Sequence, residues 1–410
     1  MSDVIPVDTP IWTLPEVRKT PAPFRMFLKL AASNWAVGVW EIVIPSGRKL
    51  VIRGRDPGPT GTLVVKDFRF VGRVMAGGDI GFAEGFMAGE WDTPDLSALL
   101  EVLSLNYDCI RRLTVGNPFM RIVNNITHFM RRNSRAGSRK NIHAHYDLGN
   151  QFYETWLDPS MTYSSARYEK PGQELSAAQR NKYRTLAESI GLERDQTVLE
   201  IGCGWGGFAE YAAREVGARV TGITISQEQY DYARKRLFTQ GLADKTDIRM
   251  VDYRDVEGRF DRVASIEMFE AVGEEYWPAY FGKIHDVLVP GGRSGLQIIT
   301  IDDEHFDSYR RRTDFIQKYI FPGGVLPSEV ALKPVIDKAG LQWSSVARFG
   351  QDYADTLAEW HVRFEAAWNE IQPLGFDERF RKLWAFYLSY CEAGFRTGRT
   401  DVIQLELKRA

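Results

Sequence analysis

The chain has 410 residues, enough for two domains, and 44% of them are hydrophobic and 26% charged. Its net charge of −2 excludes a strong general attraction to nucleic acid, and no eighteen consecutive apolar residues are present to span a bilayer. Cys109, Cys203 and Cys391 are too few and too scattered for a disulfide framework or a metal cluster. We therefore expect a cytoplasmic globular protein without a metal site.

Residues 1–115 are predicted to form a small α+β domain that contacts the membrane, the substrate or a second copy of the chain. Short alternating runs at 35–54 and 61–75, interrupted by glycine and proline, are typical of antiparallel strands and hairpins. The apolar residues of 97–110 recur at helical spacing, which favours a helix.

Residues 116–140 are predicted to be a linker. The overlapping stretch 131–141 carries five basic residues and no apolar side chain larger than alanine. Such a segment is either a solvated surface or a cationic contact for anionic lipid headgroups, where each charge contributes about 1 kcal/mol. The sequence leaves both interpretations open.

Strands and helices alternate after residue 175, within a second domain predicted over 141–410. A helix is expected from Ser226, a favourable N-cap residue, to Gly241. The alternation predicts a doubly wound, mostly parallel α/β sheet of the Rossmann-like type. Its expected strands are the apolar, β-branched runs 197–203, 219–225, 247–253, 260–268 and 294–301.

A glycine-rich run, VLEIGCGWGGF at 198–208, lies between the first strand and the following helix, where such sheets bind ligands. Gly202, Gly204 and Gly206 follow the pattern G-x-G-x-G, which differs from the dinucleotide spacing G-x-G-x-x-G. Glu200 precedes the first glycine by two residues and can bind a cationic or hydroxylated part of a ligand. The pattern indicates a cofactor loop.

The ends of the next two strands also carry polar residues. Thr224 and Gln229 offer a hydroxyl and an amide to a ribose, where a nicotinamide-binding protein would have an acid. Asp252, Tyr253 and Arg254 follow the third strand and can contact an adenine. These residues favour S-adenosylmethionine over a nicotinamide cofactor or a turn without a ligand.

Six segments in chain order resemble cyclopropane fatty acid synthases and the related mycolic acid methyltransferases. The resemblance implies a class I methyltransferase fold with aromatic-rich helical insertions. Residues 81–100 (GFAEGFMAGEWDTPDLSALL) resemble the extra N-terminal domain of the longer members, which act on phospholipids. The six segments are HYDLGNQFYETWLDPSMTYSSARY, VLEIGCGWGGFAEYAA, GITISQEQYDYA, FDRVASIEMFEAVG, QKYIFPGGVLPS and FGQDYADTLAEWHVRFEAAW.

The resemblance further implies methyl transfer from S-adenosylmethionine to the cis double bond of an acyl chain in a phospholipid. The amino acid part of the cofactor is expected near Tyr163 and Ser164. An unactivated alkene is a poor nucleophile, and its methylation leaves a carbocation, so the site must be dry, position the alkene and tolerate positive charge. Aromatic faces can tolerate positive charge. The sequence cannot distinguish aromatic residues that line such a site from those of an ordinary core. The candidates are Tyr319, Phe321, Tyr353, Trp360, Phe364, Trp368, Trp384, Phe386 and Tyr387.

A cyclopropane synthase must also remove a proton from the new methyl group to close the ring. The resemblance implies a bicarbonate base held by Cys, Glu, His and Tyr, with a second Cys near the C-terminus. Glu270, Tyr353 and Cys391 match the Glu, the Tyr and the second Cys. Ser165 stands where the first Cys is expected, and Gln297 lies at or beside the position of the His.

These two replacements predict a different product. Ser165 and Gln297 can still donate hydrogen bonds, but a neutral contact holds an anion less well than a charge-assisted one. Bicarbonate is therefore in doubt, and we expect the cation to lose a proton from a chain carbon, leaving a methyl-branched unsaturated chain. Cyclopropane synthesis is the alternative, and a small-molecule methyltransferase is a more distant one.

The expected partners follow from this reading. The substrate is an unsaturated phospholipid, reached by peripheral contact with the anionic inner face of a membrane. No nucleic acid is expected, and a homodimer is left open.

Overall fold

The computed structural model describes residues 15–33, 35–114 and 148–410, so the predicted linker and basic segment lie outside the described residues. The chain divides into two compact units. The first contains Met1–Ile126, Arg312–Phe315 and Gly375–Thr397, and the second contains Thr127–Arg311, Ile316–Leu374 and Gly398–Ala410.

The first unit holds a four-stranded sheet in the order β2-β1-β3-β4. Alternate residues of β1 are buried, as expected for a strand with one face on a core. β1 pairs with β2 antiparallel but with β3 parallel, so the expectation of purely antiparallel strands is wrong. The strands are β1 (Val37–Val43), β2 (Lys49–Arg53), β3 (Asp56–Val65) and β4 (Trp91–Asp92).

The strand prediction over 61–75 is also wrong in its second half, because β3 ends at Val65 and a helix follows. Asp67 accepts a hydrogen bond from the Arg69 N–H at 2.8 Å, which turns the chain, and Phe70 and Val74 are buried at helical spacing. The predicted helix 97–110 is divided at Asn106. The helices are α1 (Pro15–Arg18), α2 (Ala22–Ala32), α3 (Arg69–Gly77), α4 (Asp79–Met87), α5 (Leu96–Leu105) and α6 (Tyr107–Thr114).

The long helix α19 (Glu378–Arg396) belongs to this first unit, although the sequence analysis placed its residues in the methyltransferase domain. It packs against α4 and α5. The Ser97 hydroxyl of α5 donates a hydrogen bond of 2.6 Å to Glu392 and is hydrogen-bonded to the Ser389 hydroxyl at 3.0 Å. Cys391 is carried by this helix.

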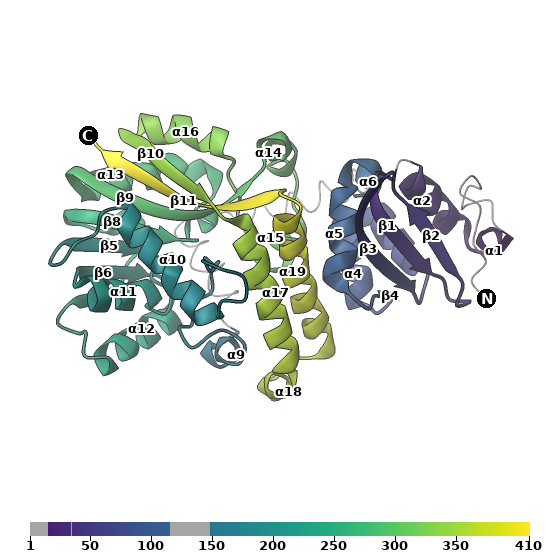
Figure 1. Cartoon of the computed structure of the whole chain (residues 1–410), viewed down its shortest axis with the longest axis horizontal. Coiled ribbons are helices and arrows are strands. Elements are labelled where there is room, and N and C mark those ends of the chain that lie inside the picture. The colour runs from purple at the N-terminus through teal and green to yellow at the C-terminus, as the bar shows by residue number, and fades with distance from the viewer. Residues whose placement is uncertain (1–14, 34, 115–147) are drawn as a thin grey trace. The chain divides into compact units, whose positions relative to one another are not determined.

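The second unit is built on a seven-stranded sheet in the order β10-β11-β9-β8-β5-β6-β7 (Figure 1). All five predicted strands form and pair in parallel, which confirms the doubly wound fold. β10 and β11 were not predicted, and β11 runs antiparallel between β9 and β10. The strands are β5 (Thr197–Ile201), β6 (Arg219–Thr224), β7 (Thr246–Met250), β8 (Phe260–Ile266), β9 (Leu288–Ile301), β10 (Leu341–Arg348) and β11 (Thr400–Arg409).

Helices cover both faces of this sheet. Ser226 caps α12 as predicted, its hydroxyl accepting from the Gln229 N–H. The helices are α9 (Asn150–Glu154), α10 (Leu175–Ser189), α11 (Gly207–Tyr211), α12 (Gln227–Thr239), α13 (Trp277–Val287), α14 (Asp303–Tyr309), α15 (Phe315–Tyr319), α16 (Glu329–Lys338), α17 (Gly350–Ala366) and α18 (Trp368–Ile371). Shorter helical turns span Ala212–Val216, Tyr253–Asp255, Phe269–Ala271, Glu274–Tyr276 and Gln372–Leu374.

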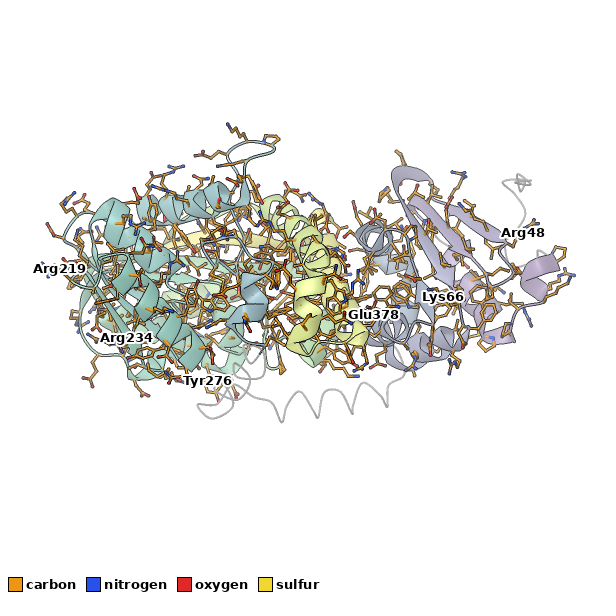
Figure 2. All side chains as sticks on the ribbon, turned by 90° about the horizontal axis from the view of Figure 1, so that it is seen from below. Arg48, Lys66, Arg219, Arg234, Tyr276 and Glu378 are labelled. Atoms are coloured by element: carbon orange, nitrogen blue, oxygen red, sulfur yellow. The ribbon has the colours of Figure 1, made fainter. Side chains whose placement is uncertain are left out.

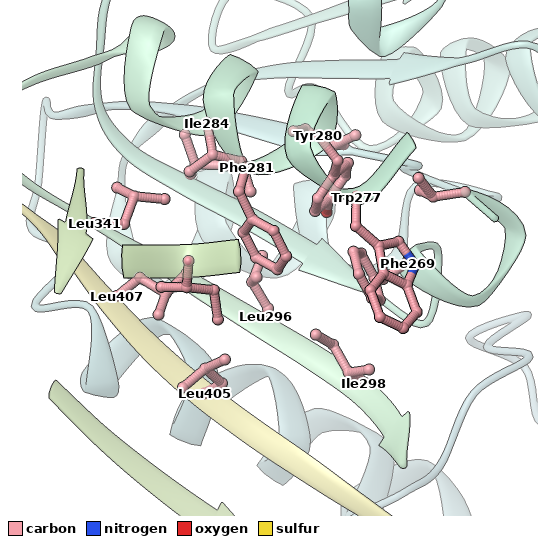
Figure 3. Packing of buried hydrophobic residues seen from close by; sticks show 14 of the residues in the cluster. Phe269, Trp277, Tyr280, Phe281, Ile284, Leu296, Ile298, Leu341, Leu405 and Leu407 are labelled. Atoms are coloured by element: carbon pink, nitrogen blue, oxygen red, sulfur yellow. The ribbon is translucent and has the colours of Figure 1, made fainter. Parts of the chain in front are cut away.

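Two apolar cores stabilise the sheet, one on each face. On one face Leu296, Ile298 and Leu405 pack against Phe281 and Ile284 of α13 (Figure 3). On the other face the sheet packs against α10, α11 and α12. Charged side chains such as Arg219, Arg234 and Lys66 are exposed (Figure 2). Of the helices in the described residues, none has the length and apolar content needed to cross a membrane.

Candidate active site

The glycine loop lies at the carboxyl end of β5. Gly202, Gly204 and Gly206 have φ values of 80°, 52° and 85°, a region that favours glycine. A Cβ at Gly202 would lie 2.6 Å from Cγ of Met268, so that glycine is needed for packing. A Cβ at Gly204 would meet no atom within 4 Å, so the loop has open space there for a ligand.

Glu200, at the end of β5, is buried. Its Oε2 atom has no hydrogen-bond partner among the described residues. Burial raises the pKa of this carboxyl well above its usual range. Because buried polar atoms are nearly always paired, this oxygen beside an open loop points to a ligand that supplies the missing donor.

Five further predicted cofactor residues lie at or shortly after the ends of β6 and β7, with Gln229 in the first turn of α12. Thr224 donates a hydrogen bond of 2.9 Å to the amide oxygen of Gln229, which brings those two side chains together. The carboxylate of Asp252 accepts hydrogen bonds from the main chain and guanidinium of Arg254, the closest at 2.6 Å. The hydroxyl of Tyr253 is buried without a partner among the described residues, and burial raises its pKa to about 12.

Tyr163 and Ser164 lie in the segment between α9 and α10. The Tyr163 ring contacts Trp156 and Trp360, with centroids 5.7 and 5.3 Å away. The Ser164 hydroxyl accepts a hydrogen bond of 2.6 Å from the ammonium of Lys182, a fully buried residue of α10. The structure thus places a buried lysine amino group, whose pKa burial lowers to about 7, directly behind this segment.

Three of the predicted catalytic residues converge, but on a residue that the sequence analysis missed. One carboxylate oxygen of Glu267, Oε1, accepts from the backbone N–H of Ser165 at 2.8 Å and from the amide of Gln297 at 2.7 Å. The other, Oε2, accepts from the hydroxyl of Tyr353 at 2.7 Å. We call Glu267, Ser165, Gln297 and Tyr353 the carboxylate cluster.

Glu267 follows β8 in an unusual backbone conformation. Its φ of 50° is in the left-handed region, which L side chains rarely adopt, and its N–H donates to the carbonyl of Gln297 at 2.8 Å. A charged residue at the carboxyl end of a buried parallel strand, three positions before Glu270, was the signal in the sequence that could have found it.

A chain of amides orients Gln297. Its side-chain oxygen accepts a hydrogen bond of 3.2 Å from Gln404, its register partner on β11. Gln404 in turn accepts from Arg167 at 3.0 Å and from Thr185 at 2.9 Å. The Ser165 hydroxyl, by contrast, donates to the carbonyl of Ala166 at 2.8 Å. The side-chain hydroxyl of Ser165 is therefore turned to the backbone of the next residue and not to the Glu267 carboxylate.

Burial and a nearby cation set the charge of the carboxylate cluster. Burial raises the pKa of Glu267, and the attraction of Lys182 together with the three hydrogen bonds opposes that rise. Burial lowers the pKa of Lys182, and the attraction of Glu267 opposes that fall. The pair is thus buried together and each partner stabilises the charged form of the other.

Glu270 has a different environment from Glu267. Its Oε1 accepts from the backbone N–H of Ile299, and its Oε2 has no partner within the described part of the chain. Burial, and then repulsion by Glu267, raise its pKa to about 8. Glu270 is therefore a neutral acid at pH 7, beside an anionic neighbour.

The remaining predicted catalytic residue, Cys391, is carried by α19 in the first unit. Burial raises the pKa of its thiol. A high thiol pKa leaves little thiolate at neutral pH. The expected role of Cys391 as the second Cys of a bicarbonate site stays a prediction. In the described ranges no group of three or more His, Cys, Asp or Glu side chains is placed to hold a metal ion.

An aromatic wall adjoins the carboxylate cluster. The ring of Tyr353 meets that of Trp360 edge-on at 6.2 Å, and Trp360 lies 5.7 Å from Trp156. Trp360 and Trp156 are almost completely buried. Aromatic faces of this kind are apolar and attract positive charge through the ring quadrupole.

Comparison with known proteins places the chain in a family. Residues 133–405 match the family described as mycolic acid cyclopropane synthetase. The chain is 38% identical over 364 residues to a tuberculostearic acid methyltransferase of Mycobacterium tuberculosis, covering 86% of this chain and 84% of that protein. It is 34% identical over 395 residues to the cyclopropane-fatty-acyl-phospholipid synthase of Escherichia coli, covering 92% and 94%.

Solved structures support the same assignment. A mycolic acid cyclopropane synthase crystallised with S-adenosylhomocysteine superposes with a TM-score of 0.62 at 29% identity, over 66% of this chain and 98% of that one. Coclaurine N-methyltransferase also reaches 0.62, but at 18% identity it shows the fold alone. The open glycine loop and the unpartnered Glu200 oxygen fit the expected cofactor. The chain therefore belongs to the mycolic acid cyclopropane synthetase family of S-adenosylmethionine-dependent lipid methyltransferases.

Proposed function

We propose that this protein methylates the cis double bond of an unsaturated phospholipid acyl chain and leaves a methyl-branched unsaturated chain. S-adenosylmethionine supplies the electrophilic methyl group when bound. The observation that carries the proposal is the engagement of Ser165, Gln297 and Tyr353 with the Glu267 carboxylate.

Residues at the carboxyl ends of β5, β6 and β7 would hold the cofactor. The free oxygen of Glu200 and the open space at Gly204 suit its amino acid part, together with Tyr163 and Ser164. The paired side chains of Thr224 and Gln229 suit the ribose hydroxyls. Asp252, Tyr253 and Arg254 would contact the adenine.

The aromatic wall would receive the acyl chain. Methylation of the alkene moves its π electrons into the new C–C bond and leaves a positive charge on the neighbouring chain carbon. The buried rings of Trp360 and Trp156 exclude water, which would otherwise capture that carbon. Their faces also attract positive charge through the ring quadrupole.

The product depends on where a base can reach. Ring closure needs a base at the new methyl group, and the resemblance assigns bicarbonate to that place. In this chain the amide of Gln297 and the hydroxyl of Tyr353 donate to Glu267, and the Ser165 hydroxyl donates to Ala166. Because these donors already bind other acceptors, they do not favour a bound bicarbonate at the new methyl group. The cation is then expected to lose a proton from a chain carbon, which gives a branched alkene.

Two relatives are named as methyltransferases and not as cyclopropane synthases. One is the M. tuberculosis tuberculostearic acid methyltransferase, and the other is a probable fatty acid methyltransferase of Pseudomonas putida, 37% identical over 269 residues. The E. coli synthase is the reason to keep cyclopropane formation as the competing outcome.

The product can be identified directly. The protein is incubated with S-adenosylmethionine and vesicles of an unsaturated phospholipid, and the released fatty esters are examined by mass spectrometry and proton NMR. Ring and branch add the same CH₂ increment, so mass shows methyl transfer and NMR decides the product. We expect olefinic signals, and an upfield cyclopropane methylene signal in their place would refute the branched product.

A further inference from the structure

Glu267 combines a charge, a buried setting and a backbone conformation that glycine would adopt at lower cost. A non-glycine residue in the left-handed region costs on the order of 1–3 kcal/mol and persists only where its surroundings hold it. Here three hydrogen bonds to the carboxylate and one from its own N–H hold it. Strain of this kind at the carboxyl end of β8, beside the cofactor loop, indicates a functional position.

We propose that Glu267 is the base of the reaction: its carboxylate takes the proton that the methylated acyl chain loses, so the enzyme needs no bound bicarbonate. This inference rests on the proposed function. It adds a catalytic residue that lies outside the set expected from the family resemblance.

The hydrogen bonds leave Glu267 one free acceptor position. A carboxylate oxygen can accept two hydrogen bonds. Oε1 accepts two, from Ser165 and Gln297, whereas the described residues give Oε2 only one, from Tyr353. The second lone pair of Oε2 is therefore available for a proton, while the other bonds fix the orientation of the group.

Glu267 also lies near both the cofactor loop and the aromatic wall. The next residue, Met268, packs against Gly202 of the cofactor loop, because a Cβ at Gly202 would lie 2.6 Å from its side chain. Glu267 is therefore close to that loop. Its partner Tyr353 contacts Trp360 of the aromatic wall. The residue itself remains partly accessible, although it is surrounded by buried neighbours.

The charges around Glu267 suit a base. Lys182 favours its ionised form, whereas burial makes the carboxylate more basic than an exposed one. Glu270, with its pKa of about 8, stays protonated at neutral pH and does not compete for the role. Two neighbouring carboxyls with different protonation states are a recurrent sign of an acid–base site.

The step balances without another reactant. A C–H bond next to the cationic carbon breaks, its electron pair becomes the new C=C bond, and the proton joins Oε2 of Glu267. The resulting carboxylic acid then passes the proton to water once the product has left.

The first test replaces Glu267 with glutamine, which keeps the shape and the acceptor for Ser165 and Gln297. We expect the turnover number to fall by about 100-fold or more, since a positioned base contributes about 10²–10⁴-fold. Affinity for S-adenosylhomocysteine should change by no more than about twofold. Unchanged turnover in Glu267→Gln would overturn the proposal.

The second test uses bicarbonate itself. The unaltered protein should keep its turnover in carbonate-free buffer and show no binding of bicarbonate by calorimetry. Glu267→Gly vacates the position and relieves the backbone, so bicarbonate or formate should bind there and restore part of the lost turnover. The matched control is Asp195→Gly, which relieves another left-handed residue at an exposed turn and should change neither property.

Different measurements test the proposed function and the role of Glu267 as the base. Methyl transfer to lipid by the unaltered protein tests the proposed function, and the ratio of variant to unaltered turnover tests Glu267. Bicarbonate binding needs no lipid turnover, so it tests the displacement of bicarbonate by Glu267 even where the lipid assay fails. Stimulation of the unaltered protein by bicarbonate would overturn the inference while leaving methyl transfer intact.

Discussion

The hydroxyl of Tyr353 donates a hydrogen bond of 2.7 Å to Oε2 of Glu267 and so joins α17 to the carboxyl end of β8. The start of α17 is itself held by β11, because the Gly350 N–H donates to Asp401 at 2.8 Å and a Cβ at Gly350 would lie 2.6 Å from that carboxylate. The position of the tyrosine hydroxyl is thus set by the sheet as well as by the helix.

Replacing Tyr353 with phenylalanine should lower activity and shift its pH dependence. The hydrogen bond from Tyr353 lowers the pKa of Glu267, so its loss raises that pKa further. Because the base must be ionised, the acid limb of the turnover profile should move to higher pH, with a loss of about tenfold at neutral pH. Steady-state rates measured against pH give this result. Tyr230→Phe, on α12, should leave the profile in place, and an unmoved acid limb in Tyr353→Phe would contradict the expectation.

Replacing Gly204 with valine should abolish cofactor binding. The branched side chain would fill the space that the loop leaves open and would also strain a backbone with φ of 52°. Calorimetry with S-adenosylhomocysteine should show a loss of affinity of at least about 100-fold, or about 2.7 kcal/mol. Gly172→Val carries the same type of backbone strain, with φ of 73° and open space, and should bind normally. Equal affinities of the two variants would remove Gly204 from the cofactor site.

Replacing Glu270 with glutamine should make stability less sensitive to pH. The folded protein keeps a proton on Glu270 up to its pKa of about 8, whereas the carboxyl of an unfolded chain loses it near 4.5. Unfolding therefore releases a proton between these values, and stability falls as pH rises, by at most about 1.4 kcal/mol per unit. Thermal unfolding at pH 5 and pH 8 should show a smaller drop in Tm for Glu270→Gln than for the unaltered protein. The exposed carboxyl of Glu193 is the control, and Glu193→Gln should behave like the unaltered protein.

Turnover on anionic vesicles should decrease as salt is added. The basic stretch 131–141 lies outside the described residues, and a contact with lipid headgroups is one of the two interpretations of its sequence. Such a contact would be screened over about 8 Å at physiological ionic strength. Vesicle sedimentation and product formation should fall together between low and high salt. Replacing its five basic residues with glutamine should remove the salt effect, whereas salt-independent turnover on the unaltered protein would exclude the contact.

The sequence predicts the parts of the fold that depend on local patterns. The five parallel strands, the Ser226 cap and the glycine loop each depend on neighbouring residues, and all three are present. The helix over 69–77 was missed because its short apolar pattern also suits a strand.

Glu267 was missed for a different reason. Nothing close to it in sequence shows that it will be buried, since its partners come from residues 102 positions before and 86 positions after it. The alternation of Leu405, Glu406 and Leu407 could have indicated β11, but its pairing with β9 joins residues 99 to 115 positions apart. Such long-range pairings are specified by the whole chain and not by a segment.

The order of the strands has a consequence for how this protein is made. β11 lies between β9 and β10, yet it leaves the ribosome after both of them. Until residues 400–409 arrive, β9 and β10 each present an unpaired edge to other nascent chains. The hydrogen bond from Gln404 to Gln297 likewise cannot form before β11 has been synthesised. The amide chain that supports the carboxylate cluster is therefore assembled among the last parts of the sheet. We therefore expect this domain to complete its folding after β11 has been synthesised, with chaperones most needed in the interval before it.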